Sequence, residues 1–302
     1  MNIKILRSDA VYRKMALASE EARDSIFREE LLVPFAFKWQ CIGAPLRAEQ
    51  PGGYDALTVV TMGGSYAPAQ ITPDRMDAIE AISSDSFWSS CEQSIRETLE
   101  GFERHGISLP VQDYLFTVLL NDPLSPMTAM TGEYCGDGGI PGYILGNIVP
   151  NERSLSMLPV ALSHEANHNV RWQFMQWSPQ VTLGDMLVSE GLAESFAASL
   201  FGEDKLGPWV SRTDADTLQS MIKPAIFKNL QEQDFNLLSA YLYGDEIMSM
   251  RGGSTVGMPY CAGYACGYAL VQHYLKKTGK SIYEATITPT ADILSAVEDF
   301  WS

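Results

Sequence analysis

The segment His164-Glu165-Ala166-Asn167-His168 constrains this chain more than any other part of the sequence. It lies within residues 154–174, whose pattern predicts a helix. Residues four apart on a helix leave the same face, so both imidazoles can bind one Zn²⁺. Glu165 is rotated by about 100° from His164 and is placed to act as a general base rather than as a ligand. The alternative is two ordinary helix histidines beside a solvated glutamate, so the rest of the chain has to supply a complete site.

A zinc site needs a third protein ligand, and carboxylates fit this role better than histidine. A metzincin motif would continue with H-x-x-G-x-x-H, but no histidine follows His168 at that spacing. Glu190 and Glu194 lie four apart on a second predicted helix, residues 181–201, among apolar neighbours. We predict that Glu190 is the third ligand and that Glu194 accepts the ring N–H of His164 or His168. Surface charges are the alternative, but two unpaired carboxylates on such an apolar helix would be costly.

Composition sets wider bounds on the class of protein. The 302 residues are 46% hydrophobic and 19% charged, which is enough for a substantial core. The net charge of -16 makes nucleic acid and anionic membrane surfaces poor partners. We find no apolar run of about 18 residues and no signal peptide, so we expect a cytoplasmic protein. Five cysteines without CxxC spacing are expected to be reduced thiols, mostly buried.

The order of predicted elements favours an α+β fold. Strands are predicted at residues 54–62, 114–120 and 143–149, with a glycine-rich loop at 131–142 that lacks the Gly-Lys-Ser/Thr of a phosphate-binding loop. The helices predicted besides the two already named are residues 8–32, 72–82, 85–105, 260–278 and 289–299, with shorter pieces within 213–230 and 234–242. Strands come first and helices alone follow, which indicates a small mixed-sheet lobe packed on a mostly helical lobe with the metal site between them. We expect residues 1–110 to form an N-terminal region of unknown role and residues 111–302 the catalytic region.

Three blocks of the sequence resemble the domain-of-unknown-function 2268 family of predicted Zn-dependent proteases. They are residues 162–171, residues 187–194, and residues 263–268 with Tyr274-Leu275 after them. Glu190, within Ser-Glu-Gly-Leu-Ala, also resembles the Asn-Glu-Gly-Phe-Ala segment that supplies the third ligand in gluzincin aminopeptidases, although its gap from His168 is a few residues longer. The resemblance implies a zincin-like fold.

Gluzincins place a tyrosine or histidine opposite the metal, so the resemblance implies such a donor to the oxyanion here. Tyr264 is the preferred candidate and Tyr260 the second, because these residues and Tyr268 recur every fourth position of a predicted helix. Small residues between them would let another helix approach closely. An aromatic packing stripe is the alternative. His273 is more typical of a surface or core histidine, and Arg171 of either an ion pair with a carboxylate or a substrate anchor.

Gluzincins also bind extended substrates along an edge strand above the motif helix. The resemblance gives this role to residues 143–149, and the glycines before that strand would allow close backbone approach. A plain structural strand is the alternative.

These features favour a single-zinc metallohydrolase of gluzincin type, a peptidase acting on peptide or protein. One Zn²⁺ per chain would be held by His164, His168 and Glu190, leaving the fourth position for water, with Glu165 as general base. Two alternatives are a non-catalytic zinc-binding or regulatory protein on a protease fold, and a metal-dependent amidase of small molecules.

Overall fold

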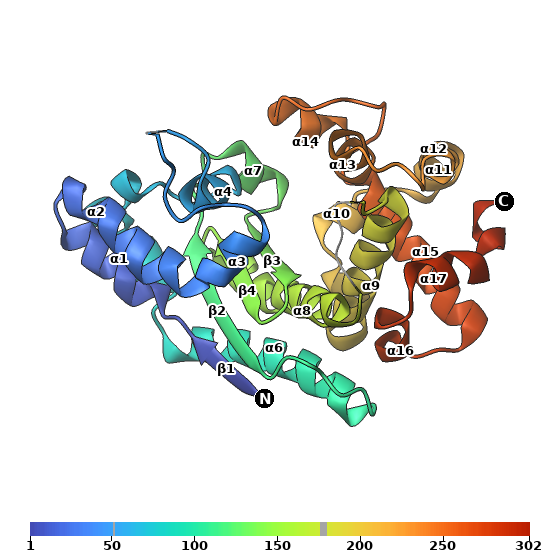
Figure 1. The fold of residues 1–302 in the computed structure, drawn as a ribbon, viewed down its shortest axis with the longest axis horizontal. Coiled ribbons are helices and arrows are strands. Elements are labelled where there is room, and N and C mark those ends of the chain that lie inside the picture. The colour runs from blue at the N-terminus through green and yellow to red at the C-terminus, as the bar shows by residue number, and fades with distance from the viewer. Residues whose placement is uncertain (51, 176–179) are drawn as a thin grey trace. The chain divides into compact units, whose positions relative to one another are not determined.

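A computed structural model describes residues 1–50, 52–175 and 180–302, and Figure 1 shows its elements. The described chain forms two compact units, each assembled from two stretches of sequence. The first contains Met1–Glu97 and Pro110–Glu165, and the second contains Thr98–Leu109 and Ala166–Ser302. The predicted catalytic region, residues 111–302, therefore has residues in both units, and its role as a separate region stays a prediction. Across the described residues we find no helix that is long and apolar enough to cross a membrane.

The first unit is organised on a four-stranded mixed sheet with the strand order β1-β2-β4-β3. β1 pairs parallel with β2 and β2 parallel with β4, whereas β3 pairs antiparallel with β4. The strands predicted at 114–120 and 143–149 are confirmed as β2 and β4. β1 was not predicted, because its four residues are too few to show an alternating pattern. The strand bounds are β1 Asn2–Ile5, β2 Asp113–Leu120, β3 Tyr134–Ile140 and β4 Tyr143–Ile148.

The glycine-rich stretch is a strand and not the loop that we predicted. It forms β3, which occupies the edge of the sheet, while β4 lies between β2 and β3. The edge position expected for residues 143–149 is therefore wrong, and β3 holds it. Glycine disfavours strands in general, so the sequence points away from one here. The reason for the glycines is steric, since a Cβ on Gly138 would lie 2.0 Å from the carbonyl oxygen of Glu165.

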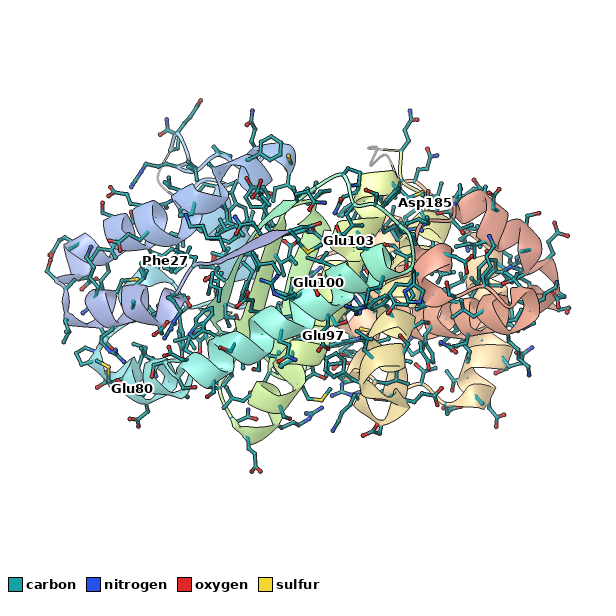
Figure 2. The ribbon with its side chains drawn as sticks, turned by 90° about the horizontal axis from the view of Figure 1, so that it is seen from below. Phe27, Glu80, Glu97, Glu100, Glu103 and Asp185 are labelled. Atoms are coloured by element: carbon teal, nitrogen blue, oxygen red, sulfur yellow. The ribbon has the colours of Figure 1, made fainter. Side chains whose placement is uncertain are left out.

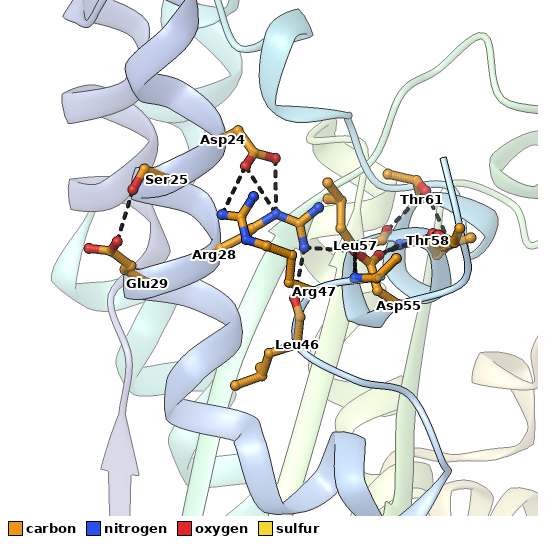
Figure 3. Close-up of polar contacts among 12 residues, drawn as sticks. Asp24, Ser25, Arg28, Glu29, Leu46, Arg47, Asp55, Leu57, Thr58 and Thr61 are labelled. Atoms are coloured by element: carbon orange, nitrogen blue, oxygen red, sulfur yellow. Dashed lines mark hydrogen bonds and ion pairs between the residues drawn. The ribbon is translucent and has the colours of Figure 1, made fainter. Parts of the chain in front are cut away.

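The strand predicted at residues 54–62 is wrong as well, because this segment forms the helix α4, Ala56–Met62. Asp55 caps the helix by accepting a 2.9 Å hydrogen bond from the backbone N–H of Thr58. The same carboxylate lies 2.9 Å from Nη1 of Arg28, and Figure 3 shows this network. Within the helix Ala56 and Val60, four apart, are the buried positions. A short apolar run does not distinguish a buried strand from a short helix, and here the cap decides.

The helix predicted over residues 8–32 is interrupted. α1 ends at Leu17, and the extended backbone of Ala18 and Ser19 separates it from α2. Tyr12 on α1 and Phe27 on α2 are nevertheless both fully buried, with ring centroids 6.4 Å apart. Besides α4, the helices that lie wholly within this unit are α1 Ser8–Leu17, α2 Glu20–Phe27, η1 Arg28–Leu32, η2 Val33–Phe35, α3 Ala36–Cys41, η3 Pro68–Gln70, η4 Pro73–Arg75, α5 Met76–Ala81 and α7 Pro126–Met130.

Two long helices, α6 and α8, have residues in both units. The amphipathic helix predicted at 85–105 is confirmed as α6, Asp85–Arg104, and the motif helix is confirmed as α8, Glu152–Phe174. Figure 2 shows Glu97, Glu100 and Glu103 following one another along α6. Ile95, Leu99 and Phe102 are fully buried on its other side.

The described residues of the second unit form helices and loops but no strand, which agrees with the prediction that helices alone follow the strands. Its core includes Phe196 stacked on Phe102 at 5.3 Å between centroids, with Tyr283 edge-on to both rings. The helices are α9 Leu183–Phe201, η5 Glu203–Lys205, α10 Pro208–Ser211, α11 Ala215–Thr217, η6 Leu218–Ile222, α12 Lys223–Lys228, α13 Phe235–Tyr243, α14 Asp245–Met250, α15 Ala262–Thr278, α16 Ile282–Thr286, α17 Thr290–Ala296 and η7 Glu298–Trp301. The small mixed sheet and the many helices confirm the α+β class, while the zincin-like arrangement with the metal between two lobes stays a prediction.

Candidate metal centre

The motif residues lie in the middle of α8, as predicted. The helix begins where Asn151 and Ser154 exchange two 2.9 Å hydrogen bonds, each side chain accepting from the other residue's backbone N–H. His164 and His168, one turn apart, are 5% and 7% exposed, and Glu165 between them is 9% exposed. Three polar side chains are therefore buried together, which is costly unless each has a partner.

The two motif histidines and Glu190 together could hold a metal ion. Each offers one ligand atom, and the three atoms lie within 4.8 Å of one another. Nε2 of His168 lies 3.2 Å from Oε2 of Glu190. Two ligands bound tetrahedrally to zinc at about 2.0–2.1 Å are about 3.3 Å apart, so this pair already has the spacing that the ion requires. Two imidazoles and one carboxylate are also a donor set that zinc accepts, so the residues fit the predicted metal.

Ser189, which the sequence analysis missed, orients one of these imidazoles. Its Oγ lies 3.1 Å from Nδ1 of His168, the ring nitrogen opposite the one that faces Glu190. Hydrogen bonding at Nδ1 fixes which nitrogen is available to a metal. The only sequence signal for Ser189 is that it directly precedes Glu190, and such adjacency on a helix does not by itself predict a shared site.

Close helix packing positions Glu190 within α9. Thr182 caps the helix and forms a reciprocal capping box with Asp185. Next to Glu190, Gly191 contacts Gly267 of α15 so closely that a Cβ there would lie 2.1 Å from the Gly267 carbonyl oxygen. The small residues of α15 thus let another helix approach, which confirms that part of the prediction.

Glu194 is buried on the same helix, and both of its oxygens accept hydrogen bonds. The backbone N–H of Gly207 donates to Oε1, and Nε1 of Trp209 donates to Oε2, each at 2.8 Å. These two donors explain how the carboxylate is tolerated in a buried position. Its contact with a ring N–H of His164 or His168 stays a prediction.

The carboxylate of Glu165 is held by the edge strand. Its Oε2 accepts a 2.7 Å hydrogen bond from the backbone N–H of Gly138 on β3. A Cβ on Gly136 would lie 2.4 Å from Cγ of Glu165, so this strand can run past the glutamate only with glycine at that position. The strand and the predicted general base are therefore in direct contact.

The three predicted tyrosines do not share one helix face. α15 begins at Ala262, so Tyr260 precedes the helix, and the prediction that it continues the stripe is wrong. Cys261, with φ of 48°, turns the chain at this point. The ring of Tyr260 lies under the guanidinium of Arg212, 4.7 Å from its centroid, which is a packing and cation–π contact.

Tyr264 lies instead beside a tyrosine that the sequence analysis missed. Its ring is 5.9 Å from that of Tyr243, at the end of α13. Burial, followed by the negative charge of Glu190, raises the pKa of Tyr243 to about 12. Tyr243 lies in an apolar, aromatic helix of ordinary pattern, which explains why the sequence does not single it out.

Comparisons with known proteins identify the family of this chain. A family model described as "Predicted Zn-dependent protease (DUF2268)" matches residues 87–295. The chain belongs to this family. An uncharacterized protein, YjfC, of Bacillus subtilis (strain 168) is 34% identical over 296 residues, covering 98% of each chain. No solved structure shows significant similarity to the chain.

Within the family-matched segment, two further residues singled out by the sequence have structural partners. Arg171 is 1% exposed and donates to the carbonyl oxygens of Thr286 and Thr288 and to the hydroxyl of Thr290. Burial lowers its pKa to about 10. His273 lies 3.2 Å from a carboxylate oxygen of Asp299, outside the candidate metal cluster.

Proposed function

We propose that this chain is a zinc-dependent metallohydrolase of gluzincin type that cleaves peptide bonds. The observation that carries the proposal is the buried cluster of His164, His168 and Glu190, with a fourth buried side chain, Glu165, fixed beside it by the edge strand. Membership of a family named for predicted Zn-dependent proteases supports the same conclusion.

His164, His168 and Glu190 would hold one zinc ion. When bound, zinc supplies a Lewis acid that makes water acidic enough to attack a carbonyl near neutral pH. In this proposal Nδ1 of His168 donates to the hydroxyl of Ser189, which leaves Nε2 as the nitrogen that can donate its lone pair.

Glu165 acts as general base in this proposal. Gly138 holds one oxygen of its carboxylate, and the other, Oε1, takes the proton of the attacking water. Glu165 then passes this proton to the leaving amine. Rotation of the carboxylate would spoil both transfers, so the backbone contact matters for the geometry.

We further propose that Tyr264 donates to the oxyanion that forms at the scissile carbonyl. The contact between its ring and that of Tyr243 supports this assignment, since Tyr243 lies close enough to Glu190 to be affected by its charge. Tyr260 is the second candidate, with its ring against Arg212.

Substrate would bind as an extended strand along β3. This strand is at the edge of the sheet and touches Glu165, so a peptide added beside it would run past the general base. A peptide or protein substrate fits this arrangement better than a small amide, which would need no strand.

Zinc analysis combined with a peptide-library assay tests the proposed function. We expect about one zinc per chain, and peptide turnover that a chelator abolishes and added zinc restores. Zinc without turnover of any peptide would favour the non-catalytic alternative. Turnover of small amides alone would favour the amidase. A purified chain that binds no zinc would contradict the proposal.

A further inference from the structure

A buried lysine, Lys38, lies in the part of the chain that precedes the family-matched segment. It lies on α3, and its side chain is only 1% exposed. A buried ammonium is costly unless it is paired and hydrogen-bonded. In the described residues, the one carboxylate within 4.0 Å of its Nζ belongs to Asp137, at 2.7 Å.

Asp137 lies on β3, directly before the glycine that contacts Glu165. Its Oδ2 accepts from Lys38, and its Oδ1 accepts a 3.2 Å hydrogen bond from the backbone N–H of Gly139. The carboxylate of Asp137 thus links Lys38 to the backbone on the C-terminal side of Gly138. A side chain anchored in this way restrains the local backbone path of the strand.

The same stretch of β3 departs from regular pairing. The register with β4 shifts between Asp137 and Ile140, which marks a bulge. A bulge frees backbone groups from the ladder and redirects them, and it is common beside functional sites. Here the N–H of Gly138 donates to the carboxylate of Glu165.

A second contact joins the same N-terminal segment to the same strands. Phe35 and Phe37 lie 5.8 Å and 6.2 Å, between ring centroids, from Tyr143 at the start of β4. Residues 35–38 thus contact both strands, β3 at Asp137 and β4 at Tyr143. The ion pair is therefore one part of a packed attachment and not an isolated surface contact.

We infer that Lys38 is a positioning residue for the general base. It holds Asp137, Asp137 holds the bulge of β3, and the bulge presents the N–H of Gly138 to Oε2 of Glu165. The inference rests on the proposed function for its catalytic consequence, but the chain of contacts can be tested without catalysis. It gives the N-terminal region a role in the site, although none of its residues is a ligand.

The test compares Lys38→Met with Arg28→Met, both in zinc-loaded full-length protein. Arg28 forms the matched control, because it also makes a largely buried ion pair in the first unit, with Asp55, the residue that caps α4. In Lys38→Met we expect the amide hydrogen exchange of Gly138 to accelerate about tenfold or more. We expect kcat to fall about tenfold to a hundredfold, with KM within about twofold and zinc content unchanged.

Arg28→Met should lower the melting temperature yet leave Gly138 exchange and kcat close to wild type. Asp137→Asn provides a second route if Lys38→Met does not fold. It removes the charge at a half-exposed position but keeps an acceptor for Gly139. It should show the same faster exchange and lower kcat.

Equal Gly138 exchange in wild type and in either β3-linked variant would overturn the inference, as would equal effects in Lys38→Met and the Arg28 control. If the wild type hydrolyses no peptide, the proposed function fails, while the exchange measurement still decides whether Lys38 positions the strand.

Discussion

Glu190 and Glu194 are the same residue type, four apart on one buried helix, but their neighbours differ. Glu190 lies 3.2 Å from a ring nitrogen of His168. Glu194 accepts hydrogen bonds from Gly207 and Trp209. Spacing from the motif was enough to predict that one of them lies near the histidines. It did not predict the donors of Gly207 and Trp209, because these come from a loop beyond the end of α9.

We expect substitutions of these two glutamates to have different effects on zinc affinity. Glu190→Gln removes a ligand charge, so we expect zinc to be lost on dialysis against a weak chelator. Glu194→Gln should retain the metal, with an affinity weakened by about tenfold to a hundredfold at most. A competition titration with a chromophoric chelator measures both. If Glu194→Gln lost zinc and Glu190→Gln kept it, the assignment of the third ligand would be reversed.

The carboxylate of Asp55 should make the stability of the fold depend on pH. Burial alone raises its pKa, but the N–H groups of Thr58 and Ala48 and the Arg28 guanidinium outweigh this, so the net pKa is lowered. A carboxylate with a lowered pKa stabilises the fold above its unfolded pKa, and this stability is lost as the pH falls through the folded pKa.

We therefore expect Asp55→Asn to lower the free energy of unfolding at pH 7 by about 1–3 kcal/mol. The difference from wild type should shrink below about pH 4, where the wild-type carboxylate becomes protonated. Urea unfolding at a series of pH values measures it. A difference that stayed constant down to pH 3 would contradict this account of Asp55.

At the scale of elements, long helices with clear caps were predictable and short or glycine-rich elements were not. α8 and α9 agree with their predicted spans because each combines a cap with a long pattern. α4 was mistaken for a strand because seven apolar and β-branched residues carry no decisive period. β3 was missed because its glycines serve contact with Glu165, which only the tertiary structure reveals.

Neighbouring glycines of β3 provide a matched pair for testing that contact. Gly138→Ala should disrupt the packing of β3 on α8, since its Cβ would lie 2.0 Å from the Glu165 carbonyl oxygen. We expect a loss of about 1–3 kcal/mol in stability together with loss of turnover. Gly139→Ala should be mild, because its Cβ would meet Asp137 at 3.7 Å. Thermal unfolding and a peptide assay of both variants test this, and equal effects would contradict it.

At the scale of the whole molecule, the family-matched segment is not a structural unit. It begins at residue 87, whereas the first compact unit begins at Met1. Backbone N–H of Leu6 donates to the carbonyl oxygen of Phe116, and Thr117 donates to that of Leu6. The N-terminal region therefore completes the sheet. No local pattern could reveal this, because the pairing joins residues more than 100 positions apart.

A chain that starts at residue 87 should consequently fail to fold cooperatively. It lacks β1 and the buried side chains of α1 to α3, so β2 would be exposed on one side. We expect a non-cooperative urea transition followed by circular dichroism, in contrast to the full-length chain. A sharp transition at the full-length midpoint would show instead that residues 87–302 are sufficient.

The central proposal is a metal site in which Glu165 acts as the general base. One comparison of two proteins tests this role of Glu165 most directly. Wild type and Glu165→Gln are loaded with zinc, their zinc content is confirmed as equal, and turnover of a peptide cleaved by the wild type is measured. We predict that Glu165→Gln binds zinc fully and loses about a thousandfold or more in kcat. A Glu165→Gln protein that carries zinc and cleaves the peptide at the wild-type rate would contradict the account.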